Sequence, residues 1–399
     1  MNQTVYDVIV VGGGPSGATA AHELALNGAS VLLLERAFRI KPCGGAIPPA
    51  MIEEFDIPDH LLVAKIRSAR MISPSSQCVD MPITNSYVGM VDREHFDPWL
   101  RQRAVAAGAE QLIGSFKSFK HRNDGLIEVT FQNKQDSKST LQTRCCRALV
   151  GADGARSQVA RQGIPKHADV PWVLAYHEIV EAPEAATEDY DPERCEVWYQ
   201  GGLSPDFYAW VFPHGKSASI GVGSAHKDFS AKKSVNELRA ISGLDTAETI
   251  RKEGAPIPMK PMKRWDDGKA LLVSGDAAGV VAPASGEGIY YAMLCGRLSA
   301  DAIKEFLVTG KASALRAPRK RFMKLHGRTF FALGLLQYFW YHSDKRREQF
   351  VEMCKDEDVQ TLTWQAYTQK KLVKKKKKEH LRVFIKDVAQ LLGLSKTAA

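Results

Sequence analysis

Cysteine is scarce in this sequence, and metal-ligand spacing is missing. Of 399 residues, 7 are cysteines, and only Cys145 and Cys146 lie close together in the chain. Adjacent cysteines make neither a C-x-x-C pair nor a zinc knuckle, so we expect neither a disulfide framework nor a cysteine zinc site. His, Asp and Glu show no ligand spacing either, and the sequence predicts no bound metal. Cysteine use of this kind fits the reduced cytosolic compartment.

Long apolar segments are missing as well. The N-terminal apolar run has no basic start and ends in glycines rather than in a cleavage site, so it is not a signal peptide. The longest other apolar stretch runs only from Thr329 to Tyr341, which is too short to cross about 30 Å of hydrocarbon as a helix. We therefore expect a cytoplasmic protein that lies on a membrane surface at most.

Basic residues outnumber acidic residues, and most of the excess comes from one lysine-rich region near the end of the sequence. Lys and Arg number 54 against 45 Asp and Glu, which gives a formal charge of +9. Seven lysines lie within 370–378, and without them the charge is 9 − 7 = +2. A nucleic-acid-binding protein usually carries its basic residues across the folded domain, so no nucleic-acid partner is expected. The position of the lysines fits a tethered contact with an anionic membrane surface.

The N-terminal segment predicts a β–α–β unit that binds a dinucleotide. Residues 6–11, YDVIVV, form an apolar run except for Asp7, as expected for a parallel strand buried on both faces. A glycine-rich turn over 12–17 and a helical segment follow. A second apolar strand over 30–34 then ends at Glu35. Strand, turn, helix, strand and terminal acid together form the complete dinucleotide-binding pattern.

Each position of this unit has a physical role. Gly12 permits the tight turn, Gly14 lets the backbone approach a pyrophosphate, and Gly17 lets the helix pack against the strand. The helix N-terminus adds unpaired N–H groups and a positive dipole end. An acid at the end of the second strand holds ribose hydroxyls, which favours FAD or NAD over NADP. The candidate dinucleotide-binding residues here are Gly12, Gly14, Pro15, Ser16, Gly17, Glu35 and Arg36.

Two later segments favour FAD over NAD. An apolar strand ending at Val150 leads into the turn G-A-D-G, and another ending at Ser274 leads into G-D-A-A-G. The second is followed by P-A-S-G-E-G-I and a helix rich in small residues, whose N-terminus can point at the cofactor. The candidate cofactor-binding residues of these segments are Asp153, Gly154, Gly275, Asp276, Gly286, Gly288 and Ile289.

In this order, the three motifs resemble those of the flavoproteins that include p-hydroxybenzoate hydroxylase. Within that class the chain resembles the geranylgeranyl reductases, especially the chlorophyll and bacteriochlorophyll branch, over nearly its whole length. The segment 41–48, KPCGGAIP, is similar to the Cys-Gly-Gly segment that this family places beside the flavin ring. The segment 205–213 matches the family signature P-x-x-Y-x-W-x-F-P at every fixed position, and 89–97 resembles its segment with a flavin-contacting arginine. The cofactor-binding residues that the resemblance implies are Cys43, Gly44, Gly45, Ala46 and Arg93.

We expect an α/β fold with a Rossmann-type FAD-binding domain of the p-hydroxybenzoate-hydroxylase kind. This domain is predicted over 1–165 and 265–310, with a small contribution to the substrate domain near 65–95. Strand-like runs with aromatic and β-branched residues predict an inserted antiparallel β-sheet substrate domain over 166–264. These runs are 172–181, 195–199, 207–212 and 217–222. A helical C-terminal region is expected over 311–399.

The end of the chain has two interpretations. Six apolar side chains between Leu381 and Leu392 fall at helical spacing, directly after the lysine-rich segment 370–378. Such a helix docks on the body of the protein, or it lies in a membrane interface beside the lysines. The second interpretation suits a water-insoluble pigment substrate and implies peripheral association with the photosynthetic membrane or with other pigment-synthesis enzymes.

The reduction of an isolated alkene requires an acid as well as a hydride. We expect one alkene carbon to be protonated while reduced flavin delivers hydride to the other, in an apolar slot without water. Cys43 is the first candidate for the acid, because the resemblance places it next to the flavin and an ordinary thiol is protonated at neutral pH. Tyr208 and Trp210 are further candidate catalytic-site residues, and Tyr290 and His214 are weaker candidates for the acid. On a strand, Tyr208, Trp210 and Phe212 share one face, which suits an isoprenoid tunnel.

The predicted function is FAD-dependent saturation of a geranylgeranyl chain to phytyl, in chlorophyll or bacteriochlorophyll biosynthesis. The substrate is a geranylgeranyl pigment, free geranylgeranyl diphosphate, or both. The resemblance implies NADPH as the electron donor, and reduced ferredoxin remains open. One alternative is an FAD-dependent aromatic monooxygenase of the same fold. Another is a non-catalytic, membrane-associated binder in pigment assembly.

Overall fold

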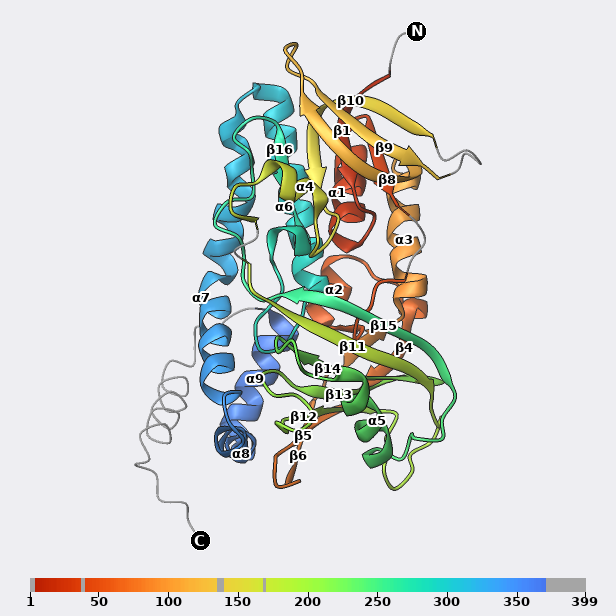
Figure 1. Cartoon of the computed structure of the whole chain (residues 1–399), viewed down its shortest axis with the longest axis vertical. Coiled ribbons are helices and arrows are strands. Elements are labelled where there is room, and N and C mark those ends of the chain that lie inside the picture. Colours follow the sequence, from red (N-terminus) through yellow and green to blue (C-terminus); the bar gives the residue numbers. More distant parts are fainter. Residues whose placement is uncertain (1–3, 37–39, 135–139, 168–169, 371–399) are drawn as a thin grey trace. The chain divides into compact units, whose positions relative to one another are not determined.

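The computed structural model describes residues 4–36, 40–134, 140–167 and 170–370. The predicted tail helix, and the lysines from Lys371 onward, therefore lie outside the described residues. The chain divides into two compact units (Figure 1). The first unit comprises Met1–Lys41, Arg93–Val173 and Pro256–Gly334, and the second comprises Pro42–Asp92, Leu174–Ala255 and Leu335–Ala399. The domains predicted from the sequence have other boundaries, at 165/166, 264/265 and 310/311, and they stay a prediction.

The first unit contains a six-stranded sheet. Its strands are β1 (Val5–Val11), β2 (Val31–Glu35), β8 (Glu110–His121), β9 (Ile127–Asn133), β10 (Leu141–Gly151) and β16 (Leu271–Val273). β1 pairs in parallel with both β2 and β10. β8 extends the parallel part beside β2, and β16 does so beside β10. β9 runs antiparallel between the long strands β8 and β10.

The parallel part of this sheet is buried on both faces, as the apolar run predicted. Val8, Ile9 and Val10 of β1 are completely buried. Burial of such a side chain contributes roughly 1.5–3 kcal/mol, so these strands form the core of the unit. The helical elements of this unit are α1 (Pro15–Leu26), α3 (Arg93–Ala106), α4 (Gln158–Gly163), α6 (Ile289–Thr309), the 3₁₀ turns η3 (Gly275–Ala278) and η4 (Ala312–Arg316), and most of α7 (Ala317–Trp340).

Helices α1 and α6 pack closely because α6 has a glycine at the contact. A Cβ on Gly296 would lie 2.4 Å from the carbonyl oxygen of Ser16 and 3.0 Å from Cβ of Thr19. Both distances are shorter than van der Waals contact, so no larger residue fits without moving one helix. This contact brings the helix after the first glycine motif against the helix after the third.

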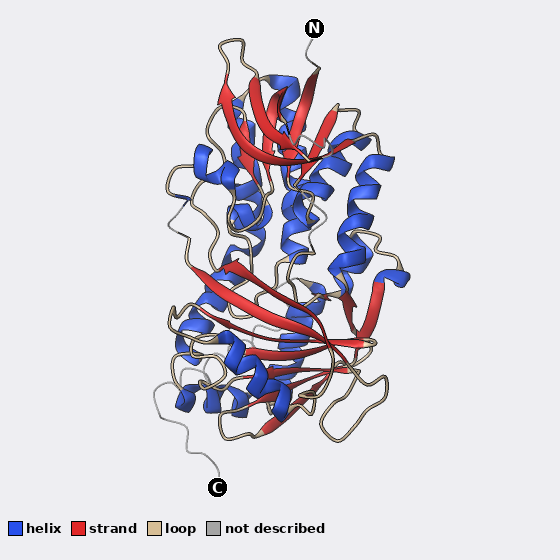
Figure 2. Cartoon of the chain, turned by 45° about the vertical axis from the view of Figure 1, so that its right-hand side comes forward, coloured by secondary structure: helices blue, strands red, loops and turns tan. Residues whose placement is uncertain are grey.

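The second unit contains a seven-stranded and a three-stranded sheet. In spatial order, the larger sheet consists of β15 (Thr249–Pro258), β11 (Trp172–Glu181), β14 (Ser217–Ser224), β13 (Ala209–His214), β12 (Arg194–Trp198), β5 (Ser68–Ile72) and β6 (Cys78–Pro82). β3 (Ala46–Ile47), β7 (Val88–Val91) and β4 (Leu62–Ile66) form the smaller one. The long strands of the larger sheet are strongly twisted (Figure 2). The helical elements are α2 (Pro49–Glu54), η1 (Asp59–Leu61), α5 (Ala231–Ile241), α8 (Asp344–Met353), α9 (Glu357–Gln369) and the end of α7.

The larger sheet differs in two details from the expected antiparallel sheet. The strands β11, β14, β13 and β12 of the predicted insertion pair antiparallel with one another, as expected. β12 also pairs in parallel with β5, which lies outside the insertion, so the sheet as a whole is mixed. The two strands come from segments far apart in the chain, and alternation within a strand does not encode its direction. The predicted strand over 207–212 begins later, at Ala209. The reason is local, because the N–H of Phe207 donates to Oγ of Ser204 at 3.1 Å instead of to a strand.

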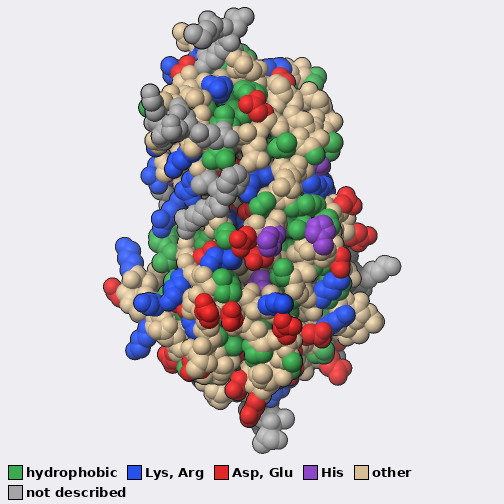
Figure 3. Space-filling view, turned by 90° about the vertical axis from the view of Figure 1, so that its right-hand side faces the viewer, with side chains coloured by type: hydrophobic (Ala, Val, Ile, Leu, Met, Phe, Trp, Pro, Cys, Tyr) green, Lys and Arg blue, Asp and Glu red, His purple; other side chains and the backbone are tan. Residues whose placement is uncertain are grey.

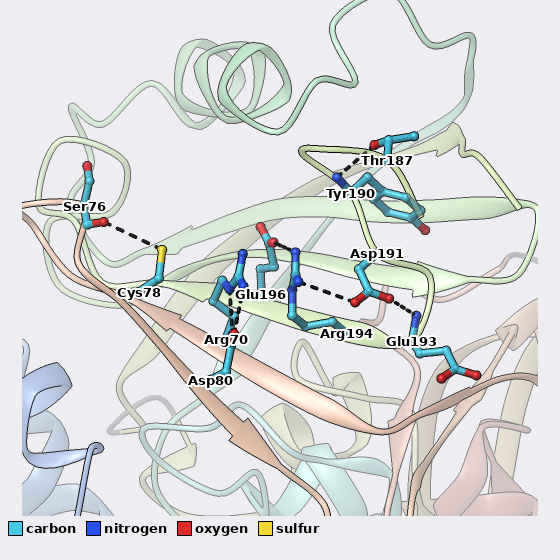
Figure 4. Close-up of polar contacts among 10 residues, drawn as sticks. All are labelled: Arg70, Ser76, Cys78, Asp80, Thr187, Tyr190, Asp191, Glu193, Arg194 and Glu196. Atoms are coloured by element: carbon cyan, nitrogen blue, oxygen red, sulfur yellow. Dashed lines mark hydrogen bonds and ion pairs between the residues drawn. The ribbon is translucent and has the colours of Figure 1, made fainter. Parts of the chain in front are cut away.

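Ion pairs tie neighbouring strands of this sheet together (Figure 4). Arg70 on β5 donates to both carboxylate oxygens of Asp80 on β6, at 2.7 and 2.8 Å. This guanidinium holds the pKa of Asp80 below its usual value. Arg194 donates to Glu196 on the same strand at 3.1 Å, while burial raises the pKa of Glu196. These pairs satisfy charged groups at the end of the sheet formed by β12, β5 and β6.

One face of the larger sheet packs against helix α5. Val235 and Leu238 of α5 are completely buried in a cluster with Val180, Ile220 and Val222 of the sheet. On the opposite face of the same strands, His177, Trp210 and Ser219 are also buried. On the side of the molecule shown in Figure 3, basic and acidic side chains are interspersed. No helix within the described ranges is both long and apolar enough to cross a membrane.

Candidate functional site

The first glycine motif forms a tight turn between β1 and α1. Gly12 has a φ of +102°, and a Cβ there would lie 2.3 Å from the carbonyl oxygen of Ala152. A Cβ on Gly17 would lie 1.8 Å from the carbonyl oxygen of Gly12. A Cβ on Gly14 would meet nothing within 4 Å. At positions 12 and 17, the protein's own backbone leaves no room for a side chain. Gly14 instead borders open space, which a phosphate group of a ligand can fill.

Two helix N-termini meet beside this turn. A Cβ on Gly275 would lie 2.7 Å from Cβ of Ser16 in α1 and 3.6 Å from Cβ of Ala292 in α6. A chain of hydroxyls joins the same elements, since Ser16 Oγ donates to Ser274 at 2.8 Å and Ser299 Oγ donates to Ser274 at 3.0 Å. The first-turn N–H groups of both helices lack acceptors within their own helix. Such unpaired donors suit a pyrophosphate, whose binding at this place stays a prediction.

Glu35 and Arg101 enclose the turn at Gly13. Glu35 ends β2, and its Oε2 accepts a hydrogen bond from the N–H of Gly13 at 2.6 Å. Arg101 on α3 is buried and donates to the carbonyl oxygen of Gly13 at 3.2 Å. Arg101 is not among the residues predicted from the sequence. Its signal was the helical spacing of Arg93, Asp97 and Arg101, which places the three side chains on one face of α3.

Arg93 lies at the start of α3, where it is buried and paired. Its guanidinium donates to both carboxylate oxygens of Asp97, at 2.6 and 2.7 Å. This bidentate pair fixes the position of the arginine. Arg36 follows Glu35 and is exposed. That either residue contacts the flavin stays a prediction.

The two aspartates of the later motifs have different partners. Asp153 caps α4, because it accepts hydrogen bonds from Oγ of Ser157 and from the N–H of Gln158 at 2.7 Å. Burial raises the pKa of Asp153 despite these bonds. Asp276 forms an ion pair with Lys41 at 2.5 Å. Lys41 belongs to the segment that carries the Cys-Gly-Gly sequence, and no role of this lysine follows from the sequence alone.

Three glycines of the later motifs lie where the backbone conformation or a close contact disfavours a larger residue. Gly154 and Gly286 have φ values of +84° and +67°. Gly288 is the N-cap of α6, directly before Ile289, and a Cβ there would lie 3.3 Å from Val281. The first unit thus brings all three predicted FAD motifs together around the turn at Gly12.

In the second unit, the Cys-Gly-Gly segment lies against strand β13. A Cβ on Gly44 would lie 3.0 Å from the ring of Phe212, and a Cβ on Gly45 would lie 2.6 Å from Nε2 of His214. The thiol of Cys43 is half-buried, and its Sγ accepts from the N–H of Gly45 at 3.4 Å. Directly after this segment, Ala46 begins β3 and pairs with β7. Two of the three segments on which the resemblance to the geranylgeranyl reductases rests, 41–48 and 205–213, are therefore in contact in the structure.

The aromatic side chains of the 205–213 segment form a continuous row. The ring centroids of Tyr208 and Trp210 are 5.9 Å apart, and those of Trp210 and Phe212 are 6.2 Å apart. This agrees with the prediction that the three share one face. At the start of the segment, Arg347 of α8 donates to the carbonyl oxygen of Pro205. The row meets the Cys-Gly-Gly segment at Phe212, whose ring lies next to Gly44.

A buried hydrogen-bond chain holds the indole of Trp210 in place. Its Nε1–H donates to Oγ of Ser219 at 3.1 Å. Ser219 also bonds to Nδ1 of His177 at 2.8 Å, and Nε2 of His177 lies 3.1 Å from Glu253. The polar atom of the indole is thereby satisfied inside the protein.

The residues of the first unit fit FAD on the evidence of their own geometry. An open space beside Gly14, two converging helix N-termini and an acid at the end of β2 are what a dinucleotide requires. Within the described ranges, no three His, Cys, Asp or Glu side chains are arranged to hold a metal ion. The individual flavin-binding roles of the predicted residues stay predictions.

Comparisons with known proteins agree with this geometry. The profile of a family described as FAD binding domain matches residues 5–314. The geranylgeranyl diphosphate reductase of Rhodobacter capsulatus is 54% identical over 389 residues, which cover 98% of each chain. The chloroplastic geranylgeranyl diphosphate reductase of Oryza sativa is 38% identical over 96% of this chain and 86% of that protein. A solved geranylgeranyl bacteriochlorophyll reductase-like protein from Thermoplasma acidophilum has the same fold, with a TM-score of 0.80 at 22% identity over 94% of this chain and 99% of that one.

Proposed function

This chain belongs to the FAD binding domain family and, within it, to the geranylgeranyl reductases, and on that premise we propose how it acts. It is an FAD-dependent oxidoreductase that reduces geranylgeranyl double bonds. The aromatic monooxygenase alternative is set aside, since the relatives with high identity are reductases. The substrate that we propose is a geranylgeranyl pigment or geranylgeranyl diphosphate, reduced to the phytyl form in chlorophyll or bacteriochlorophyll synthesis.

The contact between the Cys-Gly-Gly segment and strand β13 is the observation that supports the proposal most directly. Gly44 and Gly45 have no side chains, and their places are filled by Phe212 and His214. The thiol of Cys43 thus lies on a segment that borders a row of aromatic rings. An apolar isoprenoid needs such a surface more than polar contacts. A thiol beside it can donate the proton that an alkene requires.

When bound, FAD supplies the hydride for the alkene. The residues of this chain do the remaining work. Tyr208, Trp210 and Phe212 bind and orient the isoprenoid, and their rings exclude water from it. Cys43 holds the transferable proton on Sγ. The two helix N-termini beside Gly275 hold the negatively charged part of the cofactor.

We propose NADPH as the electron donor, as the family resemblance implies. In the described part of the chain, the glycine-rich turn at Gly12 is the site that fits a dinucleotide, and it serves FAD. NADPH therefore binds transiently at another place. Reduced ferredoxin is the other donor to be tested.

The proposed function predicts the result of an anaerobic assay. We expect NADPH to bleach the flavin absorbance of the purified protein, and geranylgeranyl diphosphate or a geranylgeranyl pigment to restore it without oxygen. The product should gain two hydrogens per step by mass spectrometry. NADH and reduced ferredoxin serve as donor controls. If the flavin stays reduced until air is admitted, the chain does not reduce these alkenes.

We also propose a peripheral contact between the C-terminal region and an anionic membrane. Helix α7 contains no acidic residue and carries Lys324 and Arg328 on its outer side. Between and beside them lie Leu325 and Phe331, which are 58% and 70% exposed. Exposed apolar side chains flanked by cations are typical of helices that lie in a membrane interface. The lysines of the segment 370–378 add to the positive charge.

This proposal predicts binding to acidic vesicles. The full chain should sediment with phosphatidylglycerol vesicles and not with neutral ones, because each lysine near an anionic surface contributes about 1 kcal/mol. Ending the chain before Lys370 should abolish sedimentation while the flavin stays bound. The double variant Leu325→Ser, Phe331→Ser tests the contribution of α7 separately. Unchanged sedimentation of both variants contradicts the proposal.

A further inference from the structure

His214 occupies the space that a side chain at position 45 would fill. Its Nε2 lies 2.6 Å from the position of a Cβ on Gly45, and Gly45 has a φ of +72°. Nδ1 of His214 lies 3.0 Å from the carbonyl oxygen of Phe212. An Nδ1–H donates to that oxygen, so Nε2 is the nitrogen that faces the Cys-Gly-Gly segment. Because the N–H of Gly45 bonds to Sγ of Cys43, the imidazole and the thiol border the same residue.

Charged groups from two strands and one loop surround this imidazole. Asp92, after β7, raises the pKa of His214, whereas His177 on β11 and Arg251 on β15 lower it. Burial is the largest effect and lowers the pKa, so the imidazole is neutral at pH 7. Arg251 in turn lies 3.5 Å from Asp92 and 3.2 Å from Glu253. His214 is thus a half-buried base that can accept one proton beside a carboxylate.

We propose that His214 supplies the proton that Cys43 loses in each alkene reduction. This inference rests on the proposed function and adds to it the route by which protons reach the site. Nothing else in the mechanism uses His214. The geometry provides what the route requires, which is a fixed tautomer, a nitrogen directed at the Cys-Gly-Gly segment and a side chain that is partly open to solvent.

The proposed steps balance in atoms and charge. The alkene gains a hydride on one carbon and the proton of Sγ on the other, which leaves Cys43 as a thiolate. His214, which takes up one proton from the solvent on Nε2, gives this proton to the thiolate, so each reduction consumes one solvent proton. The thiol and the neutral imidazole are then restored for the next double bond. The transfer is downhill, because an imidazolium is a stronger acid than an ordinary thiol.

The test uses the complete FAD-loaded protein with His214→Gln, which keeps the size and polarity of the side chain but not its basicity. We expect flavin content and reduction by the donor to be unchanged, and the first alkene reduction to stay within about twofold. Later turnovers should slow about tenfold or more at pH 8, where solvent protons are scarce. In the wild type, this later rate should fall as the pH rises, since fewer histidines are protonated. The variant should lack that dependence, and added imidazole should restore part of the rate.

A second readout does not depend on activity. Alkylation of Cys43 by iodoacetamide, followed by peptide mass spectrometry, should follow a pH profile in the wild type that His214→Gln alters. His226→Gln, which changes an exposed histidine of the same unit, is the matched control. Multiple turnovers at the wild-type rate across the pH range, with an unchanged alkylation profile, would overturn the inference. If wild-type protein reduces no alkene, the proposed function itself fails, so the two failures are distinguishable.

Discussion

Replacing Cys43 with alanine is expected to slow the oxidation of reduced flavin by geranylgeranyl substrate about 10²–10⁴-fold. Alanine removes the thiol proton, and without an acid the alkene carbon that receives no hydride accumulates charge. The thiol is half-buried, and its Sγ makes a long hydrogen bond, at 3.4 Å, to Gly45. The substitution therefore removes little packing. FAD binding and flavin reduction by the donor should stay at wild-type levels, as measured by absorbance under anaerobic conditions.

Two further variants distinguish the loss of the thiol proton from the loss of side-chain packing. Cys43→Ser preserves the size of the side chain but offers an alcohol, which is a much weaker acid than a thiol, so it should remain slow. Cys78→Ala changes an exposed cysteine on β6 and should behave as the wild type does. Normal turnover by Cys43→Ala would return this cysteine to a packing role. Tyr208 would then be the next candidate for the acid.

Replacing Gly17 with alanine is expected to destabilise the protein and to abolish FAD binding. The new Cβ would lie 1.8 Å from the carbonyl oxygen of Gly12 and 3.1 Å from Cβ of Ala152. The nearest atom belongs to the backbone of a buried turn, so helix α1 must move away from β1. Overpacking of this kind costs typically 1–3 kcal/mol, and a backbone clash lies at or above the upper end. Urea unfolding of the apoprotein and titration with FAD measure the two effects.

Gly14→Ala is the matched comparison, because its Cβ meets nothing within 4 Å. The apoprotein should unfold at the wild-type urea concentration, while the affinity for FAD falls about tenfold or more because the methyl group occupies the path of the pyrophosphate. Gly334→Ala on α7, also with open space, should leave the FAD affinity unchanged and should not lower the stability, because alanine favours a helix interior. Wild-type FAD affinity in Gly14→Ala would show that the pyrophosphate lies elsewhere.

The sequence alone determined the local pattern of this protein. Apolar runs, glycine positions and the acid at Glu35 predicted β1, α1 and β2, because these features act between residues close in the chain. The strand over 172–181 was predicted with the bounds that β11 has. The FAD motifs and the reductase family also followed from short segments with fixed spacing.

Only the tertiary structure decided which distant residues meet. In the fold, Lys41 forms an ion pair with Asp276, and Gly296 of α6 packs against Ser16. Arg101 donates a hydrogen bond to the carbonyl oxygen of Gly13. The fold also makes β5 and β12 parallel partners. These contacts join segments that no local periodicity relates, and their distances depend on how whole elements pack.

The same distinction applies to the chemistry. The sequence selected Cys43 through a short motif, but it gave His214 only a minor place among the candidate acids. In the structure, Nε2 of His214 lies next to Gly45, because strand β13 packs against the two glycines Gly44 and Gly45. A glycine in the sequence indicates only that a side chain would not fit at that position. Which neighbouring residue occupies the space is decided by the tertiary fold.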